Sequence, residues 1–67
     1  MHQIIVNGQP NQVQPGTTLT DLLVRLELDG KRIAVERNGE IVPKTLHAET
    51  ELSNGDQFEI VVAVGGG

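Results

Sequence analysis

Only one stretch of this 67-residue chain has the spacing of an amphipathic helix, which restricts the folds open to it. Thr18 is the expected N-cap, and Asp21 is placed three residues later to complete a capping box. An apolar stripe occupies positions i, i+3, i+4 and i+7 and consists of Leu19, Leu22, Leu23 and Leu26. Gly30 is the expected left-handed C-terminal cap. Because a domain this small has no other segment to cover a sheet, we expect the stripe to face the core rather than a partner.

Most of the remaining chain has the alternation or the short apolar runs of β-strands, separated by turn residues. We expect strands over residues 3–7, 12–14, 33–37 and 57–64, short apolar pieces at 41–42 and 51–52, and irregular structure over 44–50. One helix on one face of a mixed sheet of four to five strands is an α+β fold. We therefore predict one domain over residues 1–64, followed by a flexible tail of residues 65–67.

The last expected strand leads directly into three glycines, Gly65, Gly66 and Gly67. Glycine can enter slots that are too narrow for other residues, and an extended three-residue tail reaches at most ~10 Å. We expect Gly67 to carry a free carboxylate that the tail delivers into the buried site of a docked partner. A carboxylate is a poor electrophile, so it needs activation, most simply by ATP, before a sulfur or nitrogen nucleophile takes the acyl group. The alternative is a frayed terminus.

The two faces of the last expected strand differ in character. One face is apolar throughout and consists of Phe58, Ile60, Val62 and Val64. The other face is polar at Gln57 and Glu59 and becomes apolar next to the tail. If the first face packs on the helix, the second leaves an exposed apolar patch, a typical docking surface. We predict a docking patch made of Ile5, Val61, Ala63 and Val64, the alternative being that a loop covers it.

Composition argues against several classes of function. The absence of cysteine excludes disulfides, cysteine-based zinc sites and thiol nucleophiles. A formal net charge of −4 and a single aromatic residue argue against nucleic acid, and the charge disfavours anionic membranes. The apolar runs are too short for a signal peptide or a membrane span, so we expect a cytoplasmic location. His2 and His47 lack metal-ligand spacing and are expected at the surface. Ser53 and Asp56 belong to a turn, so we expect no catalytic triad with His47 and no catalytic residue.

The order of short motifs along the chain carries a resemblance. They are Ile4-Ile5-Val6-Asn7-Gly8, Pro15-Gly16, Thr18–Leu23, Val35–Asn38, Ile41–Lys44, Asn54-Gly55-Asp56 and the closing Val-Ala-Val-Gly-Gly-Gly. In this order the chain resembles the ThiS family, the small ubiquitin-like sulfur carriers of thiamine biosynthesis. The resemblance implies a β-grasp fold in which the first and last strands are parallel neighbours at the centre of the sheet.

The resemblance also implies a function. An adenylating enzyme of the ubiquitin-activating type would use ATP and magnesium to adenylate the Gly67 carboxylate, with Gly65 and Gly66 inserted in its active site. The adenylate would become a thiocarboxylate with sulfur from a cysteine desulfurase or a similar donor. Thiazole synthase would then take that sulfur for the thiazole ring of thiamine. The chain itself would bind no cofactor or metal and would be a co-substrate rather than an enzyme.

Three other functions remain open at this point. The chain resembles sulfur carriers of other pathways, such as the small subunit of molybdopterin synthase, although its approach to the tail is less aromatic. A ubiquitin-like modifier would instead be conjugated through Gly67 to lysines. A plain β-grasp binding module would have an inert terminus.

Overall fold

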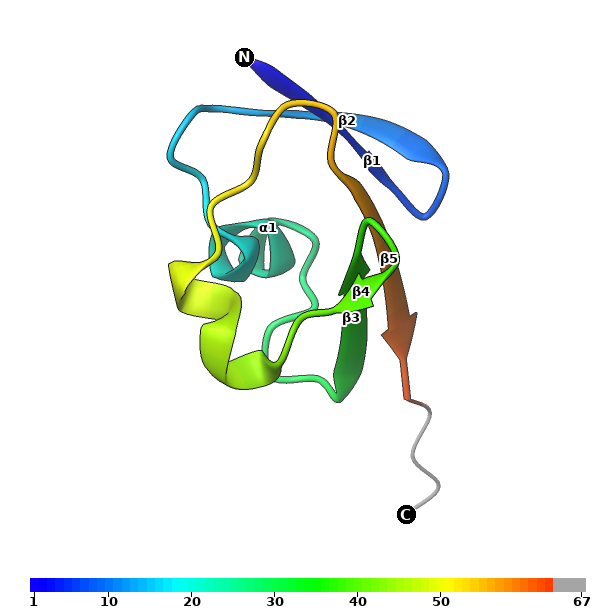
Figure 1. The fold of residues 1–67 in the computed structure, drawn as a ribbon. Coiled ribbons are helices and arrows are strands. Elements are labelled where there is room, and N and C mark those ends of the chain that lie inside the picture. Colours follow the sequence, from blue (N-terminus) through cyan, green and yellow to red (C-terminus); the bar gives the residue numbers. More distant parts are fainter. Residues whose placement is uncertain (64–67) are drawn as a thin grey trace.

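The computed structural model describes residues 1–63. One mixed sheet contains all five strands, in the order β2-β1-β5-β3-β4. Their bounds are β1 His2–Val6, β2 Gln9–Val13, β3 Ile33–Arg37, β4 Glu40–Ile41 and β5 Gln57–Val62. Strands β1 and β5 are parallel, and the other neighbouring pairs are antiparallel. Helix α1 (Leu19–Arg25) and the 3-10 helix η1 (Lys44–Glu49) lie on the same side of the sheet (Figure 1). The expected β-grasp arrangement, with β1 and β5 central and parallel, is confirmed.

Two tight turns build the hairpins of the sheet. Asn7 and Gly8 connect β1 to β2 with φ angles of 50° and 81°, and Asn38 and Gly39 connect β3 to β4 with φ angles of 51° and 87°. Positive φ at both central residues is the type I′ geometry, whose twist matches that of the flanking strands. Strand β2 begins at Gln9, three residues earlier than expected. Pro10 is tolerated there because β2 is an edge strand with one free side.

The core lies between the sheet and the two helices. It consists of Ile4, Val6, Val13, Leu19, Leu22, Leu23, Val35, Leu52, Phe58 and Ile60, with Leu26 packed against it. The leucine stripe of α1 therefore faces the core as expected. The capping box is also present: the backbone N–H of Asp21 donates to Oγ1 of Thr18 at 3.2 Å, and the backbone N–H of Thr18 donates to Oδ2 of Asp21 at 3.0 Å.

The end of α1 differs from the prediction. The helix ends at Arg25 with Leu26 as its C-cap, and Glu27 takes the left-handed conformation at φ 60°, whereas Gly30 belongs to the following turn. Glu27 N–H donates to the carbonyl of Val24 at 3.0 Å, and Leu28 N–H donates to the carbonyl of Leu23 at 2.8 Å. This is a Schellman motif. The helix ends several residues before Gly30 because this motif places Leu28 against the core.

Glu27→Gly is expected to raise the free energy of unfolding by about 0.5–1 kcal/mol. A non-glycine residue pays roughly 1–2 kcal/mol for the left-handed conformation, and the greater freedom of glycine in the unfolded chain offsets part of this gain. Chemical denaturation of the purified protein measures the change. Asp29→Gly is the matched control, because Asp29 is also exposed but its φ is not positive, so glycine there should destabilise the domain. A loss of stability in Glu27→Gly would contradict the expectation.

Three further expectations need correction. Residues expected to be irregular form η1, and His47 within it is buried rather than on the surface. The piece at 51–52 is not a strand: Glu51 forms an isolated bridge with Thr18, and Leu52 belongs to the core. Strand β5 ends at Val62, and Val64 lies outside the described residues. No described helix is long and apolar enough to cross a membrane.

Candidate functional site

Strand β5 and the residue after it fix the position of the last described residue, Ala63. The strand lies between β1 and β3 at the centre of the sheet, and it ends at the edge of the molecule (Figure 1). The backbone N–H of Ala63, the last described residue, donates to the carbonyl of Arg32 at 2.8 Å. The sheet therefore holds the last described residue before the predicted tail, and we call this position the root of the tail. The predicted site residues Gly65, Gly66 and Gly67 lie outside the described residues.

Asn7 supports β5 beyond the point where β1 stops. Its backbone N–H donates to the carbonyl of Phe58 at 2.9 Å. Its side-chain amide then donates to the carbonyl of Ile60 at 3.1 Å and accepts from the N–H of Ile60 at 2.7 Å. The side chain thus takes the place of a further strand residue and prolongs the ladder between β1 and β5. The sequence placed Asn7 at the end of the first expected strand, and no sequence pattern points to this role of its side chain.

The predicted docking patch is partly brought together. Val61 is 63% exposed, Ala63 is also exposed, and no described loop covers them. Val61 faces Ala34 across the sheet, a neighbour that sequence reasoning did not include. Ile5 is half-buried and pairs with Gln57, about 13 Å along β5 from Val61 at the usual rise of a strand. Val64 lies outside the described residues. The docking role of these residues stays a prediction.

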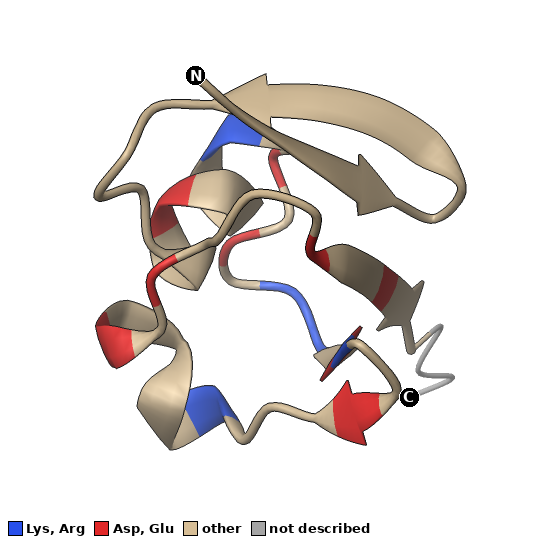
Figure 2. Ribbon diagram, turned by 45° about the horizontal axis from the view of Figure 1, so that its top comes forward, with Lys and Arg blue, Asp and Glu red and all other residues tan. Residues whose placement is uncertain are grey.

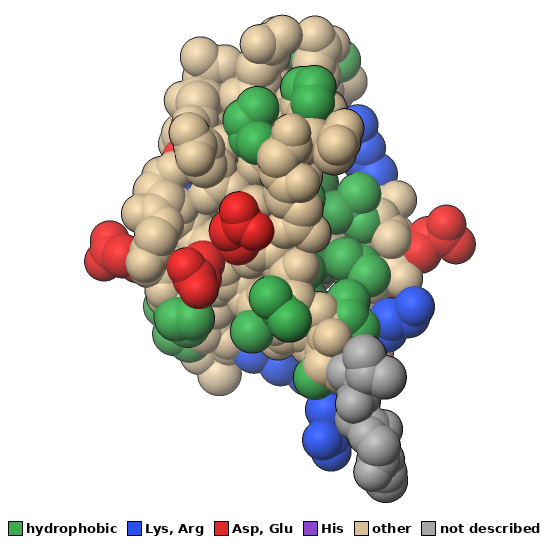
Figure 3. Space-filling model, turned by 90° about the vertical axis from the view of Figure 1, so that its right-hand side faces the viewer, with side chains coloured by type: hydrophobic (Ala, Val, Ile, Leu, Met, Phe, Trp, Pro, Cys, Tyr) green, Lys and Arg blue, Asp and Glu red, His purple; other side chains and the backbone are tan. Residues whose placement is uncertain are grey.

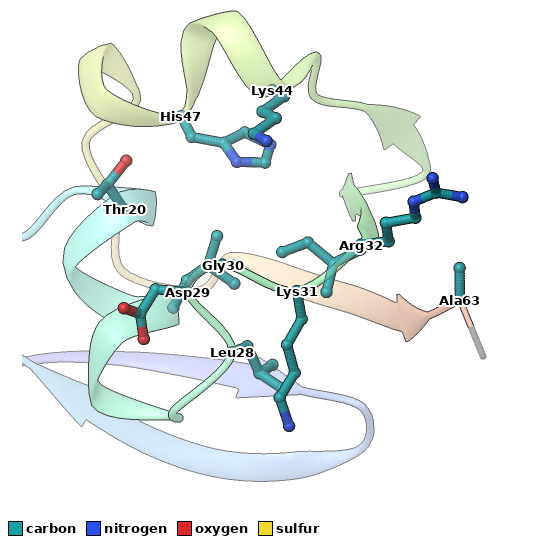
Figure 4. Close-up of a pocket in the computed structure, with 11 residues that line it drawn as sticks. Thr20, Leu28, Asp29, Gly30, Lys31, Arg32, Lys44, His47 and Ala63 are labelled. Atoms are coloured by element: carbon teal, nitrogen blue, oxygen red, sulfur yellow. The ribbon is translucent and has the colours of Figure 1, made fainter. Parts of the chain in front are cut away.

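A cavity of about 530 Å³ lies beside the root of the tail. It opens between the end of α1, the segment leading into β3, and η1, with Ala63 at its rim (Figure 4). Lys44 and His47 approach it from η1, whereas the side chain of Arg32 points away. Sequence reasoning missed the cavity because it depends on how η1 packs against the helix.

His47 has a structural role at this cavity. The ring is buried, and Nε2 lies 3.0 Å from the carbonyl oxygen of Val42. Because a carbonyl only accepts, Nε2 carries a proton and donates. Ser53, His47 and Asp56 do not form a catalytic triad. The backbone N–H of Ser53 donates to Asp56 at 2.8 Å, whereas the ring of His47 is hydrogen-bonded to the carbonyl of Val42. Within residues 1–63, no group of three or more potential metal ligands is placed to hold an ion.

Asp56 fixes the start of β5. It is buried and accepts hydrogen bonds from the N–H of Ser53 at 2.8 Å, from Nε of Arg37 at 3.0 Å and from Nδ2 of Asn38 at 3.1 Å. Arg37 also forms an ion pair with it at 2.8 Å. Burial raises the pKa of the Asp56 carboxyl, but the hydrogen bonds from Ser53, Arg37 and Asn38 and the charge of Arg37 together outweigh burial and lower it. Asp56 is therefore a charged structural anchor.

Comparison with known proteins identifies the family. The ThiS family model matches residues 4–67, which include the terminal glycines. The chain belongs to the ThiS family. Among its ThiS relatives, the sulfur carrier protein ThiS of Bacillus subtilis is 48% identical over 63 residues, which cover 92% of this chain and 96% of the relative. The crystal structure of thiamine biosynthesis protein ThiS from Geobacter metallireducens superimposes with a TM-score of 0.76 at 32% identity, covering 97% of this chain and 99% of that one.

Other relatives are longer than this ThiS-family chain. A thiazole synthase of Paramagnetospirillum magneticum is 40% identical over 65 residues, and one of Magnetococcus marinus is 38% identical over the same length. In both cases the match covers 97% of this chain but only 20% of the synthase. The ThiS-like stretch thus spans about a fifth of the length of these curated relatives.

Proposed function

We propose that this chain is a sulfur carrier of thiamine biosynthesis and that the Gly67 carboxylate is the group that carries the sulfur. The observation that carries the proposal is the match to a named sulfur carrier at 48% identity along nearly the whole of both chains. The chain has no cysteine, so no side-chain thiol is available for the task. The chain is a carrier rather than an enzyme, and the chemistry takes place in partners that act on its terminus.

The chemistry starts from an unreactive carboxylate. A carboxylate oxygen of Gly67 attacks the α-phosphorus of ATP in an adenylating enzyme of the ubiquitin-activating type, and magnesium pyrophosphate leaves. A sulfur nucleophile then attacks the acyl carbon of the adenylate, and AMP leaves with the former carboxylate oxygen. One carbon–oxygen bond is thereby exchanged for a carbon–sulfur bond. The sulfur comes from a cysteine desulfurase or a similar cytoplasmic donor. When the nucleophile is the donor's persulfide, the product is an acyl disulfide; two thiols then reduce its sulfur–sulfur bond, which releases the thiocarboxylate and the donor's cysteine and leaves the two thiols as a disulfide. The thiocarboxylate delivers the sulfur to thiazole synthase.

The fold supports this role by fixing where the tail begins. Two sets of hydrogen bonds hold the end of β5: Ala63 donates to the carbonyl of Arg32, and the side chain of Asn7 pairs with the backbone of Ile60. Docking of the domain therefore sets the position of the tail's root, and the encounter of carboxylate and partner becomes effectively intramolecular. The two relatives named thiazole synthase contain a stretch similar to this chain, which supports thiazole synthase as the acceptor partner.

The test is to locate the sulfur. The purified protein is incubated with ATP, magnesium, the matching adenylating enzyme and a sulfur donor, and its intact mass is then measured and fragmented. Exchange of one oxygen for sulfur has nearly the same nominal mass as oxidation of Met1, so fragmentation must place the change at Gly67. We expect a thiocarboxylate there, and none when ATP is omitted.

Two other results would overturn the proposal. An unmodified Gly67, with an enzyme shown to be active on its own carrier, would indicate a β-grasp binding module with an inert end. An isopeptide bond to a lysine of another protein, stable to denaturation, would indicate a protein modifier.

A further inference from the structure

Three of the five cationic side chains of this acidic chain line the cavity beside the root of the tail. Lys31 and Arg32 belong to the segment before β3, and Lys44 begins η1 (Figure 2). All three are exposed, and none forms an ion pair within residues 1–63. The other two cations are engaged elsewhere, because Arg25 is hydrogen-bonded to a main-chain carbonyl of β2 and Arg37 forms the ion pair at the start of β5. The uncommitted positive charge of the described residues is therefore concentrated at this cavity.

The lining of the cavity is apolar between these cations. Leu23 of α1 is buried, and Leu28 and Ile33 are half-buried against the core. Asp29 also lines the cavity, so three cations there face a single carboxylate. An occupant that suits this lining combines an apolar group with negative charge.

The directions of the cations indicate what kind of occupant fits. Lys44 extends toward His47, whereas Lys31 and Arg32 extend away from the cavity in different directions (Figure 4). A site for a small anion places a few polar groups that converge on one point, and these three do not converge. Nucleic acid is repelled by the net charge of −4 on the rest of the chain. Charges spread around an apolar cavity instead fit a protein segment that has several carboxylates beside an apolar side chain.

The cavity and the predicted docking patch lie on different faces of β5. The cavity opens on the side of α1 and η1, whereas Glu59 and Val61 lie on the opposite face. Glu59 is directly opposite Glu36 of β3, which makes that face acidic. Figure 3 shows red acidic side chains on that face and blue basic side chains at the lower end of the molecule, where β5 ends. Because the two surfaces differ in charge and share only Ala63 among the described residues, they can bind two different proteins at once.

We infer that the cavity is the docking site of the protein that donates the sulfur, and that this donor presents an acidic segment with an apolar side chain. The inference rests on the proposed function. In that function the sulfur reaches the acyl carbon while the adenylating enzyme still holds the tail, so the donor approaches a carrier that is already docked. Four residues follow Ala63, and an extended chain of that length reaches ~14 Å. A donor docked at the cavity is therefore held within that distance of the acyl carbon, and proximity favours the transfer.

The double variant Lys31→Gln/Lys44→Gln tests the inference. Both side chains are exposed and unpaired within residues 1–63, so the midpoint of thermal unfolding should change by less than about 4 °C. Affinity for a purified cysteine desulfurase, measured by calorimetry on the carrier bound to its adenylating enzyme, should fall by at least about tenfold. The affinity that remains should depend less on salt concentration than that of the wild type. Affinity for the adenylating enzyme itself should not change.

Free sulfide gives a second readout, because it needs no docking site. Hydrosulfide attacks the acyl carbon of the adenylate, AMP leaves, and the thiocarboxylate forms without any change of oxidation state. With sulfide in place of the desulfurase, the double variant should form thiocarboxylate at the wild-type rate. With a limiting concentration of desulfurase, its cysteine substrate and a thiol reductant, it should be at least about tenfold slower. A lysine needed for folding or for adenylation would slow both reactions.

Two further variants complete the experiment. Thr20→Phe leaves the charge unchanged but adds a ring at an exposed position that lines the cavity, and it should also weaken desulfurase binding. The matched control is Gln9→Glu/Gln14→Glu. It makes the same change in net charge as the lysine variant, at exposed positions in and just after β2, which is the edge strand on the other side of β1. It should leave desulfurase affinity at the wild-type value.

The outcomes separate this inference from the proposed function. If the wild type forms thiocarboxylate with sulfide but does not bind the desulfurase, or if the lysine variant binds it with native affinity, the inference is wrong and the function stands. If the lysine variant loses affinity for the adenylating enzyme or for thiazole synthase instead, the assignment of the cavity to the sulfur donor is overturned. If an active adenylating enzyme places sulfur on Gly67 from neither sulfide nor desulfurase, the proposed function fails, and the inference fails with it.

Discussion

Adding one residue after Gly67 is expected to reduce thiocarboxylate formation at least about a hundredfold, because reacting groups displaced by even 1 Å can lose that much rate. One extended residue moves the terminal carboxylate by about 3.5 Å relative to the root of the tail. Hydrogen bonds hold the root of the tail in place and prevent a compensating shift. Ala63 is hydrogen-bonded to the carbonyl of Arg32, and Ile60 is hydrogen-bonded to the side chain of Asn7. The readout is the fraction of protein that carries sulfur at its terminal residue, measured by mass spectrometry under single-turnover conditions.

Three variants separate the effect of the tail's length from the effect of a side chain within it. An added glycine lengthens the tail without adding a side chain, and an added alanine does both. Gly66→Ala keeps the length but places a Cβ in the slot that the tail enters. We expect all three to be poor substrates. A glycine added before Met1 is the matched control, since it lengthens the chain by one residue at the other end and should leave the reaction unchanged.

The contrary result would be informative. Full activity of the protein with an added glycine would mean that the terminal carboxylate is not the reacting group, and the carrier proposal would fall. Activity of Gly66→Ala alone would keep the carrier but show that the partner's slot tolerates a methyl group.

The start of α1 and the two tight hairpins could be predicted because each depends on a few neighbouring residues. Thr18 and Asp21 cap each other, and Asn38-Gly39 sets its own turn. The end of α1 could not be predicted in this way. It is decided by the contact of Leu28 with the core, which overrides the local preference for glycine at the left-handed position.

The missed parts of the site depend on contacts between distant residues. His47 is buried because η1 packs beside α1, and Asn7 reaches Ile60 across 53 positions of sequence. The opposition of Glu36 and Glu59 becomes visible only once the register of β3 and β5 is known. The alternation of β5, by contrast, correctly predicted that Val61 lies on the exposed face, because alternate residues of a strand point to opposite faces.

Asp56→Ala is expected to lower the free energy of unfolding by about 3 kcal/mol, since removing one partner of a buried ion pair typically costs 3–5 kcal/mol and Arg37 is partly exposed. The substitution leaves Arg37, Asn38 and the N–H of Ser53 without their shared acceptor. A domain this small has only a few kcal/mol in total, so the variant should be largely unfolded at 37 °C. Chemical denaturation at pH 7 measures the loss. Glu51→Ala is the control, because only its main-chain carbonyl binds Arg37.

The pH dependence of stability distinguishes the charge of Asp56 from its shape. A carboxyl whose pKa is lowered by folding contributes stability above its unfolded pKa, and that contribution is lost as the pH falls through its folded pKa. Asp56→Asn keeps the shape but removes the charge. The stability gap between wild type and Asp56→Asn should therefore be constant near neutral pH and should shrink in acid below about pH 4. A gap that stays constant into strong acid would mean that packing, rather than the charge of Asp56, holds the start of β5 against Arg37 and Asn38.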